Sequence, residues 1–308
     1  MIEIINRPLV IARRSNLHRF SRPLGMPGRR ELLIKGAGLL AFAGIAGTLL
    51  RKAKAATTYI ATPEETEGPY WVDEQLNRSD LQVDPSDNSV QPGFPLVFTV
   101  TVSSLVSGAI TPISGAIVDI WHCNALGIYS DEAAYNPGGG DGTVTTTGKK
   151  FLRGYQVTNA KGQVRFLSIY PGWYTSRTGH IHCRVRIGGF TSPTTNFTTQ
   201  FFFPDSLTDQ IYLLSPYNQR TSPRDTYNTT DSVYTSTDCV TGGEDGTETT
   251  FNITTTSSYA SANYNVNLDL SSTSACVGGG TGGGPPTGGG PPTGGGPPSG
   301  PPPGGAGQ

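Results

Sequence analysis

Two histidines separated by a single residue are the first feature of this 308-residue sequence that could carry out chemistry. His180 and His182 begin the run His-Ile-His-Cys-Arg-Val-Arg-Ile, whose alternation of polar and apolar residues predicts a β-strand over residues 180–187. Alternate side chains of a strand point to opposite faces, so both imidazoles share one face while the apolar residues face the core. Imidazoles placed in this way can converge on one metal ion.

Tyrosines near this pair indicate which metal the histidines would bind. A phenol, with a pKa of about 10, becomes a strong anionic ligand only when a cation keeps it deprotonated. Ferric iron is a hard ion that suits phenolate oxygen, whereas zinc more usually takes three histidines or thiolates. The residue types therefore favour ferric iron, and a zinc or copper site for hydrolytic or redox work is an alternative that metal analysis would separate.

Five separate motifs occur in one order between about residues 60 and 235, and together they are far more specific than any one of them. The motifs are Thr66-Glu67-Gly68-Pro69-Tyr70, the stretch from Val118 to Ser130, Phe151-Leu152-Arg153-Gly154, the block from Tyr170 to His182, and the segment from Thr199 to Asp205. With these motifs the sequence resembles the intradiol ring-cleavage dioxygenases, especially their exported, protocatechuate 3,4-dioxygenase-like branch. The resemblance implies a non-haem Fe(III) enzyme.

Carried over position by position, the resemblance implies that Tyr129, Tyr174, His180 and His182 are the four iron ligands. It places Tyr174 and His182 axially, and Tyr129 and His180 in the equatorial plane. Arg177, three residues before His180, would stabilise negative charge on the bound substrate.

A fourth site residue and the reaction follow from the same resemblance. Gln200 would orient ligands or intermediates through its amide. A catechol would chelate the metal and displace Tyr174, whose phenolate could then act as a base. Dioxygen would attack the activated ring, and the product would be a cis,cis-muconate-type dicarboxylic acid. The partners implied are a small catecholic substrate and O2, with no nicotinamide or flavin motif in the sequence.

Each assignment has a purely structural alternative. Tyr129 and Tyr174 could be half-buried sheet aromatics, Arg177 a surface ion pair and Gln200 an edge amide. His122 is expected to be a hydrogen-bonded structural histidine. Tyr70, the last residue of the first motif, is given no defined role. Tyr170 and Trp173 are expected to fill the core, with a place in the pocket lining as the alternative. Cys123 and Cys183 are expected to be small buried side chains, with a second disulfide as the alternative.

The elements that must position these residues are predicted to be strands. Period-two or continuous apolar runs occur at residues 96–102, 116–123, 164–169, 197–203 and 264–270, and turn-forming residues separate them. No helical period of comparable length is found, which predicts an all-β fold, a two-sheet β-sandwich. The long connection from Asn136 to Lys150 is one of the active-site loops expected at the edge of the sandwich.

The N-terminal 55 residues are predicted to be a twin-arginine signal region. Arg29 and Arg30 precede the uncharged apolar run from Gly36 to Leu50, and Ala53-Lys54-Ala55 offers a cleavage site. The run is short for a membrane span, so we expect a periplasmic or extracellular protein without stable membrane insertion after cleavage, with a retained anchor as the alternative.

The catalytic domain is expected to cover residues 56–276 and to end in a disordered Gly/Pro-rich tail, residues 277–308. Residues 1–55 contain eleven of the 22 basic and two of the 23 acidic residues, so a mature chain would carry about ten net negative charges. This acidity argues against nucleic acid as a partner. Cys239 and Cys276 could form a disulfide. A secreted, non-catalytic β-sandwich binding module is the alternative function, and the sequence leaves the oligomeric state open.

Overall fold

The computed structural model describes residues 59–238, 243–271 and 277–278. The predicted signal region and the pair Cys239 and Cys276 lie outside the described residues, as does the tail beyond residue 278. Export, the disulfide and the disordered spacer therefore stay predictions. Val277–Gly278, at the start of the predicted tail, forms β11 and pairs with β1, Glu64–Glu65. None of the helices in the described ranges has both the length and the apolar character that crossing a membrane requires.

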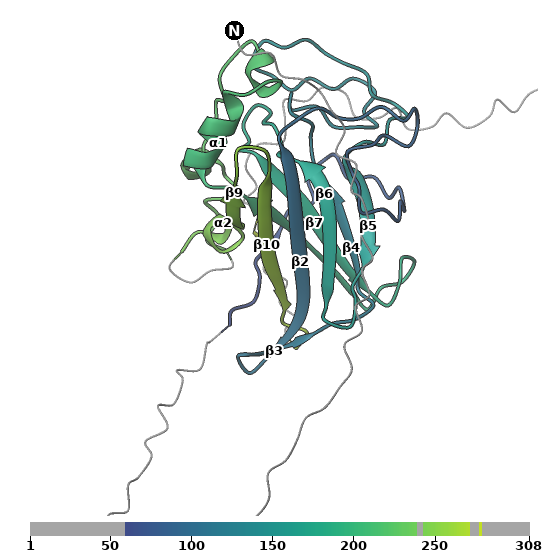
Figure 1. Ribbon diagram of the computed structural model, residues 1–308. Helices are drawn as coiled ribbons and strands as arrows, with labels where there is room; N and C mark the ends of the chain where they lie inside the picture. The colour runs from purple at the N-terminus through teal and green to yellow at the C-terminus, as the bar shows by residue number, and fades with distance from the viewer. Residues whose placement is uncertain (1–58, 239–242, 272–276, 279–308) are drawn as a thin grey trace, which may run out of the picture. The chain divides into compact units, whose positions relative to one another are not determined.

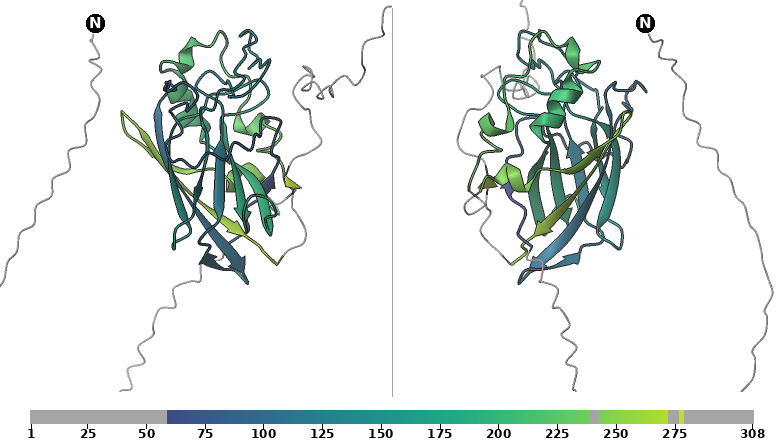
Figure 2. Two further views of the ribbon diagram at one scale, coloured as in Figure 1. Left: turned by 90° about the vertical axis from the view of Figure 1, so that its right-hand side faces the viewer. Right: turned by 60° about the vertical axis from the view of Figure 1, so that its left-hand side comes forward.

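Two larger sheets form a sandwich, as predicted (Figures 1 and 2). One sheet has the order β3-β2-β10-β9, with β6 also paired to β2. Its strands are β2 (Pro95–Val106), β3 (Ala109–Pro112), β6 (Gln163–Ile169), β9 (Asn252–Thr255) and β10 (Ala260–Leu268). The other sheet has the order β5-β4-β7-β8. It contains β4 (Ile117–Trp121), β5 (Arg153–Val157), β7 (His180–Ile187) and β8 (Thr195–Phe202).

The predicted runs become strands because each buries a row of apolar side chains between the sheets. Phe98 of β2 and Phe166 of β6 are fully buried and stack at 5.3 Å between ring centroids. Phe201 of β8 packs against Phe251 at 4.8 Å. The alternation predicted to continue to Leu270 stops earlier, since β10 ends at Leu268 and Leu270 is exposed.

Helices are a minor part of the described chain, and α1 was not predicted. It runs over Asp205–Tyr212 directly after β8, and buries Thr208 and Ile211. The other helical segments are single turns at Tyr217–Gln219 (η1), Asn228–Thr230 (η2) and Asp245–Glu248 (α2). Eight residues are too few to show a clear helical period in the sequence, which explains why α1 was missed.

Several long connections leave the four-stranded sheet at one end, where β4 and β8 end and β5 and β7 begin. Trp121 lies opposite Arg153 and His182, and His180 lies opposite Phe202. The connections over residues 122–152 and 170–179 and the chain after β8 therefore meet there. In Figure 1 loops and α1 gather at this end of the sandwich. The topology thus brings together residues that are far apart in the sequence.

Candidate metal centre

β7 presents the two predicted histidines on one face, as its alternation indicated. Ile181 and Cys183 are fully buried in the core between the sheets. His180 and His182 face the other way and are also buried, because the connections from the sheet end cover them. Their side chains therefore lie in a closed, largely aromatic interior.

Three donor atoms meet beside β7. The Nε2 atoms of His180 and His182 are 3.1 Å apart, and the hydroxyl oxygen of Tyr129 lies 3.1 Å from the His182 Nε2. His180 Nδ1 lies 2.7 Å from the carbonyl oxygen of Thr178, so this nitrogen carries the proton and donates it, which leaves Nε2 as a lone pair. The geometry gives three nitrogen and oxygen donors directed at one point.

Tyr174 completes the set from the connection that precedes β7. Its ring lies 5.8 Å from that of Tyr129 and 5.6 Å from that of His180, between ring centroids. Arg177 Nη1 lies 3.5 Å from the Tyr174 hydroxyl oxygen, and Nη2 of the same guanidinium donates to Gln200 Oε1. The six residues predicted for the site are thus brought together in one cluster.

Burial controls the protonation of these donors in the protein alone. It lowers the pKa of His180 and of His182 well below the usual range, with the nearby positive charge of Arg177 acting in the same direction. The same burial raises the pKa of Tyr129 well above its ordinary value and that of Tyr174 to about 12, with Arg177 opposing the shift in both. Neutral imidazoles present free lone pairs, whereas the phenols need a cation to become phenolates.

Three neighbours hold the Tyr129 and His182 rings. Tyr70 stacks on Tyr129 at 4.5 Å between centroids, which places Tyr70 in the site. Arg153 donates from Nε and Nη2 to the hydroxyl and carbonyl oxygens of Ser130 and from Nη1 to the carbonyl of Tyr70, and so ties both tyrosine segments to β5. Trp121 stacks on His182, with 4.7 Å between the ring centroids and an angle of 5° between the ring planes.

The His182 ring is not oriented by a hydrogen bond at Nδ1, as the His180 ring is. Its Nδ1 is buried without a hydrogen-bond partner, in contrast to Nδ1 of His180. The stacked Trp121 and the backbone at Gly68 confine the ring instead. A β-carbon at Gly68 would lie 3.3 Å from the His182 Cε1, and Gly68 has φ +69°, so glycine suits this position doubly.

His122 and Tyr170, which were expected to have structural roles, lie outside the donor cluster. His122 is buried between the Cys123 carbonyl oxygen and the Ser168 hydroxyl, at 2.8 and 2.7 Å, and contributes no atom to the cluster. Tyr170 is fully buried in the core, with its hydroxyl 2.7 Å from that of Thr208.

Three further side chains match the expected structural roles. Trp173 is buried and its ring supports the Arg220 guanidinium at 3.8 Å. Cys123 and Cys183 are buried free thiols. Cys183 lies in the core between the sheets, whereas Cys123 packs with Tyr129 and Tyr174 in the aromatic cluster of the site.

Two residues of the site were missed. Asp231, fully buried, accepts a hydrogen bond from the Arg177 Nε at 2.9 Å. Tyr135 packs against Tyr70 and donates to the carbonyl oxygen of Gly127 at 2.7 Å. Nothing around Asp231 in the sequence marks it, whereas Tyr135 directly precedes the predicted loop and could have been included.

The chemistry of the donors fits a hard trivalent ion better than a thiolate-binding one. No group of three or more His, Cys, Asp or Glu side chains is placed to hold a metal within the described ranges, so the tyrosines are indispensable to the set. Two imidazoles and two phenols supply nitrogen and hard oxygen donors without sulfur, which suits ferric iron. The residues present therefore fit the metal that the sequence predicted.

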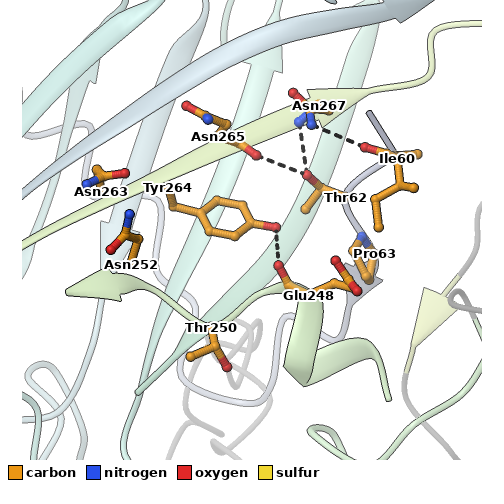
Figure 3. A pocket seen from close by; sticks show the side chains of 11 residues that line it. Ile60, Thr62, Pro63, Glu248, Thr250, Asn252, Asn263, Tyr264, Asn265 and Asn267 are labelled. Carbon is orange, nitrogen blue, oxygen red and sulfur yellow. Dashed lines mark hydrogen bonds between the residues drawn. The ribbon is translucent and has the colours of Figure 1, made fainter. Parts of the chain in front are cut away.

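A cavity of about 280 Å³ lies at different residues (Figure 3). Its lining includes Thr62, Asn252 and Tyr264, and the Tyr264 hydroxyl donates to the carbonyl of Glu248 at 2.9 Å. None of the six predicted site residues lines it. The shape of the surface alone would suggest a binding site in this cavity, but the converging donor atoms lie elsewhere.

The fold and the cluster define a β-sandwich protein with a buried histidine and tyrosine donor set. Residues 66–256 match the family model described as Dioxygenase (Dioxygenase_C). This range contains the whole cluster. The chain belongs to this family, the intradiol ring-cleavage dioxygenases.

Individual relatives agree with this assignment. The chain is 29% identical over 154 residues to catechol 1,2-dioxygenase 1 of Acinetobacter lwoffii, covering 49% of this chain and 44% of that protein. It is 33% identical over 100 residues to chlorocatechol 1,2-dioxygenase of Pseudomonas sp. (strain P51), covering 30% and 38%. The chain thus spans about two fifths of the length of these curated relatives.

A solved structure matches more completely. The intradiol ring-cleavage dioxygenase from Tetranychus urticae superposes with a TM-score of 0.55 at 29% identity, covering 71% of this chain and 99% of that one. A second dioxygenase crystal structure gives the same TM-score at 30% identity. The predicted family and fold are confirmed, and the protocatechuate-like branch stays a prediction.

Proposed function

We propose that this protein is a non-haem Fe(III)-dependent dioxygenase that cleaves a catechol-type ring with O2 between its hydroxyl-bearing carbons, giving a cis,cis-muconate-type dicarboxylic acid. The observation that carries the proposal is the convergence of Nε2 of His180, Nε2 of His182 and the hydroxyl oxygen of Tyr129 within 3.1 Å contacts, with Tyr174 beside them. These four residues would hold the iron. Bound ferric iron would withdraw electron density from a chelated catecholate and so expose a ring carbon to dioxygen.

The protein's own groups would supply proton transfer and charge stabilisation. The Tyr174 phenolate oxygen, once released by the incoming substrate, would accept a proton from a catechol hydroxyl. Arg177 lies beside this oxygen, so its positive charge would stabilise negative charge that develops on the substrate. Gln200 accepts from the Arg177 Nη2 and donates through Nε2 to the Thr66 carbonyl at 2.9 Å, so its amide is fixed in orientation.

Burial would exclude bulk water from the reacting ring. Tyr129, Tyr135 and Trp121 are almost fully buried, and Tyr70 packs on Tyr129, Tyr135 and Tyr174. A dry, aromatic enclosure strengthens the effect of each fixed charge and limits side reactions of activated intermediates.

An anaerobic optical titration tests the proposal. Purified, iron-loaded protein is expected to show a tyrosinate-to-ferric charge-transfer band that shifts when catechol is added and decays to a muconate-type product when oxygen is admitted. A colourless protein that takes up no ferric iron would contradict the proposal and support a non-catalytic binding module. Uptake of zinc or copper in place of iron would support the hydrolytic or redox alternative.

The stack of Trp121 on His182 leads to a specific prediction. Trp121→Leu is expected to weaken iron retention roughly tenfold, because His182 has no hydrogen bond at Nδ1 and loses the ring that confines it. The measurement is the rate of iron loss to a chelator. Trp71→Leu is the control, since Trp71 packs on Trp121 at 4.6 Å and its loss should leave iron retention nearly unchanged. Equal effects in the two variants would contradict a specific role for the stack.

A further inference from the structure

We infer that Asp231 is a positioning residue for the reaction, which sets the orientation of Arg177 and of the segment that orients His180. The inference rests on the proposed function and adds a residue to it. Asp231 lies after η2, in a segment that the sequence motifs do not include.

Both carboxylate oxygens of Asp231 are fully used. The side chain is buried, and Oδ1 accepts from the backbone N–H groups of Val233 at 2.9 Å and Tyr234 at 3.3 Å. Oδ2 accepts from Arg177 Nε at 2.9 Å and from the backbone N–H of Thr178 at 2.8 Å. One oxygen thus anchors Asp231 to its own turn, and the other holds the chain beside the metal centre.

The hydrogen bond from the Arg177 Nε to Asp231 determines the direction of the rest of the guanidinium. A guanidinium is planar, so fixing Nε leaves Nη1 and Nη2 with set directions. Nη1 then lies 3.5 Å from the Tyr174 hydroxyl and Nη2 donates to Gln200. Asp231 therefore aligns the charge that would act on the substrate with the tyrosine that would take its proton.

The bond to Thr178 connects the same carboxylate to a histidine. The Thr178 N–H donates to Asp231, and the Thr178 carbonyl accepts from His180 Nδ1 at 2.7 Å. The Thr178 side chain is held as well, since its hydroxyl lies 3.0 Å from the Asn228 Oδ1. A single buried anion thus restrains two groups of the site that are three residues apart in the sequence.

Charge also distinguishes Asp231 from an ordinary turn residue. Arg177 is about 12% exposed at its side chain, and a guanidinium placed in such surroundings needs a counter-ion. Asp231 supplies that ion at Nε, while Nη1 and Nη2 face Tyr174 and Gln200. Its loss would free Arg177 to reorient.

Asp231→Asn is the decisive substitution. It keeps the size of the side chain but removes the charge, and an amide NH2 at Oδ2 would face two donors. With kcat normalised to iron content, we expect a fall of about 100-fold, the loss typical of a misplaced charge-stabilising group. The KM for catechol should change far less. Asp231→Glu restores the charge, and its kcat is expected to be about tenfold higher than that of Asp231→Asn.

Asp119→Asn is the matched control. Asp119 is buried and accepts from Arg186 at 2.7 Å, but Arg186 contacts none of the site residues through the bonds it makes, to Asp119 and Asp73. This variant should lose stability without a comparable fall in kcat. The metal-free protein gives a second readout, because the NMR signal of the Arg177 Nε–H should lose its protection from solvent exchange in Asp231→Asn only.

The outcomes separate the inference from the function on which it rests. An active wild-type protein whose kcat falls equally in Asp231→Asn and Asp119→Asn would overturn the inference alone, as would an unchanged Arg177 Nε–H signal. A wild-type protein with no ring-cleaving activity would overturn the proposed function and the inference with it. A large kcat loss confined to Asp231→Asn, partly recovered by Asp231→Glu, supports both.

Discussion

His180→Ala is expected to reduce iron affinity by more than about 100-fold and to abolish ring cleavage, because loss of a ligand exceeds the 10- to 100-fold effect typical of groups that only support a ligand. The substitution removes one of the three donors that meet within 3.1 Å. The Thr178 carbonyl would also lose its donor. Metal analysis after dialysis, with catechol turnover under added iron, provides the measurement.

His122→Ala is the control for losing any buried histidine. His122 has the same burial and two hydrogen bonds, but it lies outside the cluster. We expect a loss of roughly 2–4 kcal/mol in the free energy of unfolding, with iron stoichiometry retained in the folded fraction. If His180→Ala bound iron as well as His122→Ala did, the assignment of His180 as a ligand would be wrong.

Gly127→Ala is expected to destabilise the protein by about 3–5 kcal/mol, the combined cost of a left-handed backbone for alanine and of overpacking. Gly127 has φ +80°, and a β-carbon there would overlap the carbonyl oxygen of Trp173. This close approach lets the segment leading to Tyr129 lie against the segment leading to Tyr174. The variant should therefore bind iron less tightly as well, which unfolding and metal titrations would show together.

Gly115→Ala separates the two causes. Gly115 has φ +82°, nearly the same backbone conformation, but a β-carbon there would meet no atom within 4 Å. Gly115→Ala should lower the free energy of unfolding by only about 1–2 kcal/mol and leave iron binding unchanged. Similar losses in the two variants would mean that backbone conformation alone accounts for the effect, and that the contact with Trp173 is not tight.

Much of the sheet structure could be predicted because its signal is local. The runs around Phe98, Phe166 and Phe201 alternate or are continuously apolar, and each fills the space between the sheets. The polar face of β7 was expected to turn away from the core, and it does. It is nevertheless buried, because connections distant in the sequence close over His180 and His182.

The six site residues could be proposed because they fall in ordered motifs, but their surroundings could not. Asp231 is one aspartate among many, and only the approach of its turn to the Tyr174–Arg177 segment makes it a partner of Arg177. The same holds for the stack of Trp121 on His182, which depends on the register between β4 and β7. Neither leaves a periodic pattern.

The sequence by itself determined the family, the all-β class and which side chains could hold a metal. Residue type, alternation and motif order can be read directly from the amino-acid sequence. Only the tertiary structure decided that Nε2 of two histidines and the hydroxyl of Tyr129 meet at one point, and that Asp231 aligns Arg177 beside Tyr174. The reason is physical: the contacts of Tyr129 with His182 and of Asp231 with Arg177 join residues 53 and 54 positions apart, and their distances follow from strand register and loop closure.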